Sequence, residues 1–236
     1  LFTEGLKHDE THLGLLLALN KVYAVQSGIM INPDVSLYWK RNANLKIAER
    51  VLKEPFVTAQ DQLTMAELYF TEERYEKAKE LINNYLKTGR ESAPWFNLKG
   101  QLHLIQDEFT EAIRAFKTAI KLEAHNLNLT LNLGNAYLRN KDYFEADKIF
   151  KKILKRDPNN VDALIGLGES IMQRSSDESD EAMLEAAENY FKEAVKLGKS
   201  GGGSKRLDLH APKSANTKRV YKDIKLSDIY YALGYI

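Results

Sequence analysis

The segment His8-Asp9-Glu10-Thr11-His12 is where residue types and spacing come closest to a metal or catalytic site. Two histidines four residues apart share one face of a helix and could bind one zinc ion together. The zinc-protease pattern needs glutamate directly after the first histidine, and here that residue is Asp9. No third ligand is evident in the sequence. We therefore interpret this segment as the solvated start of a helix and predict no metal site.

Other patterns that carry chemistry are missing from the sequence as well. It has no cysteine, so neither disulfides nor thiolate chemistry are available. It has no glycine-rich phosphate loop, no nucleophile elbow and no pair of carboxylates placed for acid–base catalysis. The sequence therefore predicts a protein that is not an enzyme and that needs no cofactor.

The composition is that of a globular or repeat protein. Of 236 residues, 44% are hydrophobic, which is enough for a sizeable core. The net charge of +1 argues against a dedicated nucleic-acid binder, and no apolar run is long enough to insert into and cross a membrane. Because the chain begins at Leu1, we interpret it as an excised fragment from which a targeting segment can have been left out. We expect a soluble protein and favour the cytoplasm.

Charge is divided unevenly along the chain. Residues 205–236 contain seven of its 34 basic residues but only three of its 33 acidic ones, so the remainder is acidic overall. An acidic body and a basic tail would attract each other. The alternative is an ordinary difference between segments, because salt screens exposed charges.

A spacing of 34 residues recurs among small and aromatic residues. It separates Gly100, Gly134 and Gly168 from one another, and it separates Phe116 from Phe150. Small residues let two helices cross closely, and aromatic residues fill the space between neighbouring helix pairs. One helix pair cannot bury its apolar face alone, so such pairs stack. The spacing predicts a series of antiparallel helix pairs.

Residues 126–159 contain the clearest copy of this pattern. Its marked positions are Leu133, Gly134, Tyr137, Ala146, Phe150 and Pro158. The segment resembles the tetratricopeptide repeat (TPR), in which L-G-x2-Y is followed by A-x3-F and then by proline, although Thr130 replaces the usual first tryptophan. The resemblance implies an all-α, right-handed superhelical solenoid of antiparallel helix pairs. It also implies an adaptor or scaffold that binds other proteins.

The same register divides the chain into repeats. Four TPR-like repeats are predicted at 59–92, 93–126, 127–160 and 161–199, the last with a seven-residue insertion that we interpret as an acidic, solvated loop. Two upstream helices fit the pattern poorly. Residues 1–58 are therefore interpreted as a degenerate N-terminal helical repeat or cap.

The resemblance also implies a binding groove that is lined by the first helix of each repeat. The residues that it places there combine polar side chains with an apolar stripe, which a partner would cover. They are Leu63, Glu67, Phe70, Asn97, Gln101, Leu104, Ile105, Leu131, Asn135, Leu138, Arg139, Ile165, Glu169 and Met172. A clamp for an acidic peptide C-terminus is not expected, because these positions lack lysine and include two glutamates.

The end of the sequence changes character. Residues 200–204 include Gly-Gly-Gly-Ser and are predicted to form a flexible linker. Residues 205–236 are basic and end in a short amphipathic helix with apolar residues at steps of three and four. We expect these apolar residues to anchor the helix in an apolar groove. They are Leu226, Ile229, Tyr230, Leu233 and Ile236.

Three interpretations of this tail stay open. The favoured one is an engineered fusion, in which the linker tethers a partner's short linear segment to the TPR groove. In the second, the chain is a structural assembly protein, its own tail caps the solenoid, and its partner binds elsewhere. In the third, the glycine-rich stretch is natural. The sequence does not indicate an oligomeric state.

Overall fold

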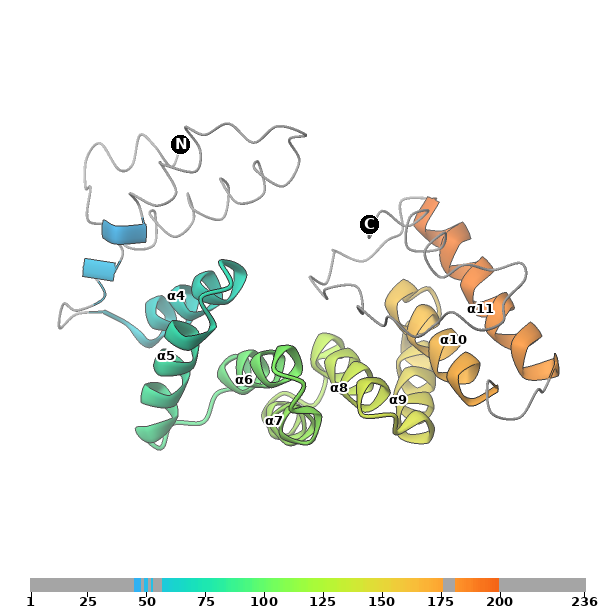
Figure 1. The fold of residues 1–236 in the computed structure, drawn as a ribbon, viewed down its shortest axis with the longest axis horizontal. Coiled ribbons are helices and arrows are strands. Elements are labelled where there is room, and N and C mark those ends of the chain that lie inside the picture. The colour runs from blue at the N-terminus through green and yellow to red at the C-terminus, as the bar shows by residue number, and fades with distance from the viewer. Residues whose placement is uncertain (1–44, 48, 51, 53–56, 176–180, 200–236) are drawn as a thin grey trace. The chain divides into compact units, whose positions relative to one another are not determined.

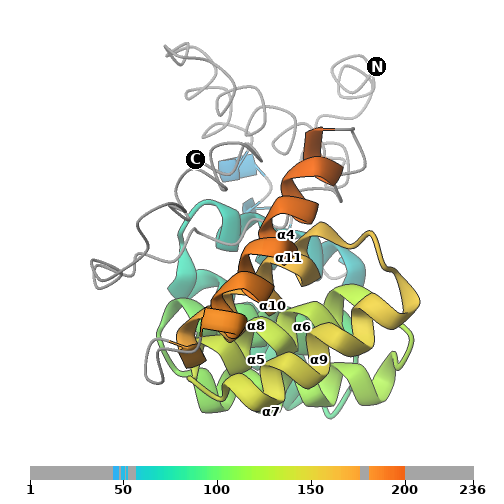
Figure 2. The ribbon, with the colours of Figure 1, turned by 90° about the vertical axis from the view of Figure 1, so that its right-hand side faces the viewer.

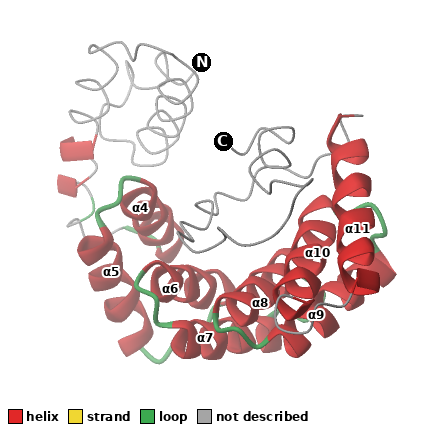
Figure 3. Cartoon of the chain, turned by 45° about the vertical axis from the view of Figure 1, so that its right-hand side comes forward, coloured by secondary structure: helices red, strands yellow, loops and turns green. Residues whose placement is uncertain are grey.

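The structure is a computed structural model that describes residues 45–47, 49–50, 52, 57–175 and 181–199. Segment 8–12, the linker, the basic tail with its five predicted anchors, and most of the predicted N-terminal cap lie outside the described residues. Within the described residues, the elements are helices joined by loops and turns (Figure 3). The predicted all-α fold class is confirmed.

Eight helices follow one another in the described residues (Figure 1). Their bounds are Ala59–Thr71 (α4), Tyr75–Lys87 (α5), Ala93–Ile105 (α6), Phe109–Leu122 (α7), Leu127–Arg139 (α8), Tyr143–Arg156 (α9), Val161–Ser175 (α10) and Glu181–Lys199 (α11). The chain divides into two compact units, Leu1–Leu102 and His103–Ile236, and the division falls inside α6.

In the first unit, α4 packs against α5. The side chains of Trp95 and Tyr85 stack with their ring centroids 4.4 Å apart and their planes 10° apart. Trp95 is 2% exposed and belongs to a cluster with Leu63, Ala66 and Ile82. The aromatic pair thus joins the end of α5 to the start of α6 through buried apolar surface.

In the second unit, α8 packs against α7 and α9, and α10 packs against α8, α9 and α11. Figure 2 views this unit from its α11 end. Helices α8 and α10 begin at amide caps: the Asn126 side chain accepts hydrogen bonds from the backbone N–H groups of Asn128 (3.1 Å) and Leu129 (3.4 Å). Asn160 accepts one from Ala163 at 3.0 Å. These caps satisfy N–H groups that have no partner inside the helix.

Three turns contain a residue in the left-handed region although none of the three is glycine. Glu73 (φ 58°), Asp107 (φ 58°) and Lys141 (φ 65°) follow α4, α6 and α8, and each is 34 residues from the next. A side chain in this conformation costs roughly 1 kcal/mol. The same backbone conformation therefore recurs at the turns between α4 and α5, between α6 and α7, and between α8 and α9.

Phe150 of α9 is fully buried and lies between two glycines of neighbouring helices. A Cβ atom at Gly134 of α8 would lie 2.7 Å from the Phe150 ring, and one at Gly166 of α10 would also overlap that ring. Phe191 of α11 lies in a similar place against Gly168, where a Cβ would come within 2.7 Å. The missing side chains create the space that the phenylalanine rings fill.

Candidate protein-binding surface

Helices α8 and α10 of the second unit are each the first helix of an antiparallel pair, and they contact each other directly. They carry four of the predicted groove residues that are not fully buried: Asn135, Leu138, Arg139 and Glu169. We call the surface formed by these residues the groove face. The predicted tail anchors lie outside the described residues, so their contacts stay a prediction.

Arg139 occupies the end of α8 and is held on two sides. One of its guanidinium nitrogens donates to Asp107 Oδ1 at 3.1 Å, and the guanidinium lies 5.3 Å from the centroid of the Phe109 ring. Asp107 is the left-handed residue of the turn before α7. The unusual backbone conformation of this turn thus presents a carboxylate to the last residue of α8.

Glu169 of α10 is half-buried on the groove face. Burial raises the pKa of its carboxyl group to about 7, and the positive charge of Arg139 opposes this rise. Burial has this effect because it disfavours the charged form of an acid. Near neutral pH the Glu169 carboxyl group therefore exists in both protonation states. A nearby cation would favour its charged form.

The apolar part of the predicted groove is more buried than we expected. Five of its residues are at most 7% exposed and belong to the hydrophobic core: Leu63, Leu104, Leu131, Ile165 and Met172. Phe70 and Leu138 pack against core clusters, and Ile105 is 37% exposed. Leu104, Leu131, Ile165 and Met172 share one core cluster, so packing between neighbouring helices buries them. The accessible groove is therefore more polar than predicted.

The polar groove residues keep partial exposure. Four of them are half-buried: Glu67, Asn97 and Gln101 in the first unit, and Asn135 in the second. Arg139 is exposed. Within the second unit, the structure brings Arg139 and Glu169 close enough for their charges to interact. These residues can donate and accept hydrogen bonds along a bound peptide backbone.

Sequence reasoning missed a charged cluster between α9 and α10. Asp147 is 4% exposed and accepts a hydrogen bond of 2.7 Å from Arg174, whose guanidinium lies 4.2 Å from the Phe144 ring centroid. Ser170 donates to the Tyr143 carbonyl at 3.0 Å. A buried aspartate with an arginine partner fastens the two helices in one register. An acidic residue directly after the packed Ala146 was the available signal.

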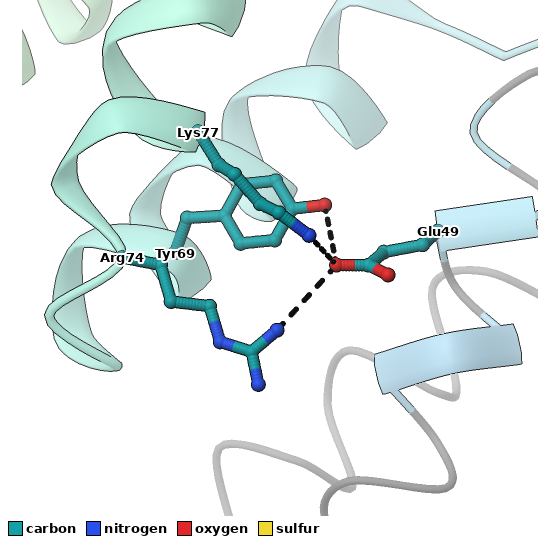
Figure 4. Close-up of polar contacts among 4 residues, drawn as sticks. All are labelled: Glu49, Tyr69, Arg74 and Lys77. Atoms are coloured by element: carbon teal, nitrogen blue, oxygen red, sulfur yellow. Dashed lines mark hydrogen bonds and ion pairs between the residues drawn. The ribbon is translucent and has the colours of Figure 1, made fainter.

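A second missed cluster surrounds Glu49 in the first unit (Figure 4). One carboxylate oxygen accepts from Lys77 at 2.7 Å and from the Tyr69 hydroxyl at 3.0 Å, and Arg74 lies 3.5 Å away. Burial raises the pKa of Glu49, but the hydrogen bonds from Lys77 and Tyr69 and the nearby positive charges outweigh it and hold the pKa below the ordinary value. This cluster ties residue 49 to α4 and α5.

No metal-binding constellation is found among the described residues, where no three His, Cys, Asp or Glu side chains converge. His103 Nδ1 and Glu108 Oε2 lie 2.5 Å apart as an isolated pair. None of the described helices is long and apolar enough to cross a membrane.

Stacked helix pairs with small residues under buried aromatics define the chain as a TPR-type helical-repeat protein, a class that presents extended surfaces to other proteins. Residues 43–164 match the model of the tetratricopeptide repeat protein 21 C-terminal ARM domain, and residues 131–201 match a tetratricopeptide repeat model. Since the first match covers more than half of the chain, the chain belongs to the family of the tetratricopeptide repeat protein 21 C-terminal ARM domain. The predicted TPR family is thereby confirmed.

Solved structures share this fold at low sequence identity. MamA is 19% identical with a TM-score of 0.58, covering 73% of this chain and 99% of its own. YrrB, described as a TPR protein with an unusual peptide-binding site, is 17% identical with a TM-score of 0.55 over 84% and 97%. Yeast Tom70 is 18% identical with a TM-score of 0.58 over 83% of this chain and 38% of its own. These likenesses show the fold alone. No curated protein matches the sequence.

Proposed function

We propose that this chain is a non-enzymatic scaffold whose groove face binds a basic, partly helical segment of a partner protein. The segment is represented by residues 205–236, which the glycine-rich linker 200–204 joins to the scaffold. The interaction combines burial of apolar anchors with pairing of basic side chains and groove carboxylates. The observation that carries this proposal is the half-buried carboxyl group of Glu169 on the groove face.

A partly desolvated carboxylate favours a cationic ligand. The raised pKa of Glu169 means that its charged form lacks part of the stabilisation that water provides. A lysine or arginine of a bound segment would supply that stabilisation. Residues 205–236 contain seven such cations and three acidic residues. Asn135, one turn before Arg139 on α8, would form hydrogen bonds with the backbone of the segment.

The class of protein also supports the proposal. TPR-type proteins are generally scaffolds without catalysis, and YrrB shares the fold and has a peptide-binding site. The five apolar anchors of the tail, among them Tyr230 and Leu233, would supply hydrophobic burial. Electrostatic attraction would orient the segment before it docks.

The test separates the scaffold from the tail. Residues 1–199 are produced alone, their melting temperature is measured, and a synthetic peptide of residues 205–236 is titrated by calorimetry. Saturable binding to a folded body supports the proposal. A body that unfolds or aggregates without the tail supports the alternative, a structural assembly protein capped by its own C-terminal helix.

Two variants locate the binding site. Glu169→Gln should weaken binding about fivefold at pH 8, because it removes one groove charge. The matched control, Glu185→Gln on the exposed surface of α11, should change it less than about twofold. Leu233→Asp in the peptide should abolish binding. Equal affinities for all variants would refute the groove face as the site.

Protonation gives an independent readout. Bound cations lower the pKa of the carboxylate that they contact, so binding releases a proton when Glu169 is protonated beforehand. The affinity should therefore fall as the pH drops below about 7. The Glu169→Gln variant should show no such dependence in this range.

A further inference from the structure

Helices α7 and α9 of the second unit, each the second helix of its pair, contain an unusual excess of basic residues. Together they have eight Lys or Arg and three Asp or Glu. The first helices α8 and α10 contain two of each kind. Helix α8 packs against both α7 and α9, which Figure 1 shows on either side of it.

These cations repeat in register. Three positions of α7 recur in α9 after 34 residues, and all six residues are exposed. We call them the basic face: Arg114, Lys117, Lys121, Lys148, Lys151 and Lys155. Steps of three and four residues place the three members of each helix on one side of it. Lys152 and Arg156 are exposed beside them on α9.

Pairing within the chain neutralises only part of this charge. Arg114 lies 3.8 Å from Glu111, Lys148 lies 2.6 Å from Glu145, and Lys151 lies 3.9 Å from Asp147. Among the described residues, Lys121, Lys152, Lys155 and Arg156 form no ion pair. Exposed cations at neighbouring positions repel one another, and an anionic ligand relieves this repulsion.

We infer that the basic face docks an Asp/Glu-rich segment of a partner protein, at a place separate from the groove face. In an extended peptide, alternate side chains on one side are about 6.6 Å apart. Cations three or four residues apart on a helix have Cβ atoms about 5–6 Å apart. Alternate carboxylates of an extended segment therefore match the spacing of the cations along α7 or α9.

The chemistry of the face favours a peptide over other anionic ligands. The exposed aromatic side chain that α9 adds beside its six residues, Phe144, already has the Arg174 guanidinium 4.2 Å from its ring centroid, so one face of the ring is occupied and it offers bases a poor stacking surface. The large apolar side chains that α7 and α9 expose, Leu122 and Phe144, lie on different helices and do not form the continuous apolar face of a membrane-binding helix. Flexible lysines instead suit a ligand with several separate carboxylates. This interaction does not depend on the groove face or on residues 205–236.

The experiment uses the full chain and a fluorescein-labelled peptide of about twelve residues in which glutamate alternates with serine. Fluorescence anisotropy is measured in low salt. Lys121→Gln combined with Lys155→Gln, two exposed members of the basic face, should weaken binding about fivefold, because two charge contacts are lost. The charge-matched control Lys87→Gln with Arg90→Gln, two exposed cations of the first unit, should weaken it less than about twofold.

A second control removes two cations from the tail, which could itself attract the peptide. Lys218→Gln with Arg219→Gln should also have less than a twofold effect. Equal losses for the three double variants would overturn the inference, since they would show attraction by charge alone. So would equal binding of a peptide with glutamine in place of glutamate. Preferential binding of poly(U) RNA, or of vesicles that contain phosphatidylserine, would likewise overturn it.

Discussion

The first helices α8 and α10 and the second helices α7 and α9 hold charge in opposite ways. The first helices have few charges, and one of them, Glu169, is half-buried with a pKa raised to about 7. The second helices have many charges, and the six of the basic face are exposed. A buried charge is sensitive to pH and to a single partner group, whereas exposed charges act through their number. One repeat architecture thus presents two surfaces that differ in the number and burial of their charges.

The largest effect on stability should come from Phe150 of α9, which packs against both first helices, α8 and α10. Phe150→Ala should lower the free energy of unfolding by about 3–5 kcal/mol, because it leaves a cavity between Gly134 and Gly166. Urea unfolding followed by circular dichroism measures this change. The control is Phe144→Ala in the same helix, where the side chain is 68% exposed and the loss should stay below about 1 kcal/mol. Similar losses would mean that Phe150 does not hold the helices together.

A smaller, pH-dependent effect should distinguish the groove face. Glu169 ionises near 4.5 in the unfolded chain and near 7 in the folded one. Between these values the unfolded state loses its proton first, so stability falls as the pH rises through this window. Glu169→Gln removes this loss and should stabilise the chain by about 1–3 kcal/mol at pH 8 but little at pH 4. Thermal melts at both pH values test this, and Glu185→Gln should show no such difference.

The turn that joins α8 to α9 should respond more weakly. Lys141 has a φ of 65°, which glycine adopts without steric strain. Lys141→Gly should therefore stabilise the chain by about 0.5 kcal/mol, after part of the relief is offset by the greater freedom of the unfolded chain. Lys152→Gly, in the middle of α9, should instead destabilise it by about 1 kcal/mol. Urea unfolding measures the change in the free energy of unfolding for each variant. Changes of opposite sign support strain at the turn, and changes of the same sign contradict it.

The smallest effect is expected on the basic face. Lys121→Gln with Lys155→Gln should change the free energy of unfolding by no more than about 0.5 kcal/mol, because both side chains are exposed. Chemical denaturation at two salt concentrations measures it. A large loss would show that these lysines stabilise the fold and would remove the contrast with the groove face.

The sequence was sufficient to predict the helix pairs and the family. The 34-residue spacing that includes Gly134 and Phe150 reports a contact between neighbouring helices, and that contact is present in the structure. Such local, repeated packing leaves a periodic trace in the sequence. The repeat boundaries and the insertion stay predictions.

The character of the groove was harder to predict. Leu131 and Ile165 were assigned to an accessible surface, yet they are 3% and 6% exposed, because packing between neighbouring helices decides their burial. The Glu49 cluster joins residues up to 28 positions apart and follows no repeat. The raised pKa of Glu169 likewise depends on the surroundings that the fold creates, and residue type alone does not reveal it.

The place of Phe150 has a consequence for how the second unit unfolds. In many repeat proteins the terminal repeats unfold one by one, because each repeat contacts only its neighbours. Here one ring of α9 fills the space left by glycines in both α8 and α10. If α8 or α10 unfolds, the Phe150 ring becomes exposed and its packing against the other helix is weakened. The three helices should therefore exchange their protected amide hydrogens in a single cooperative step.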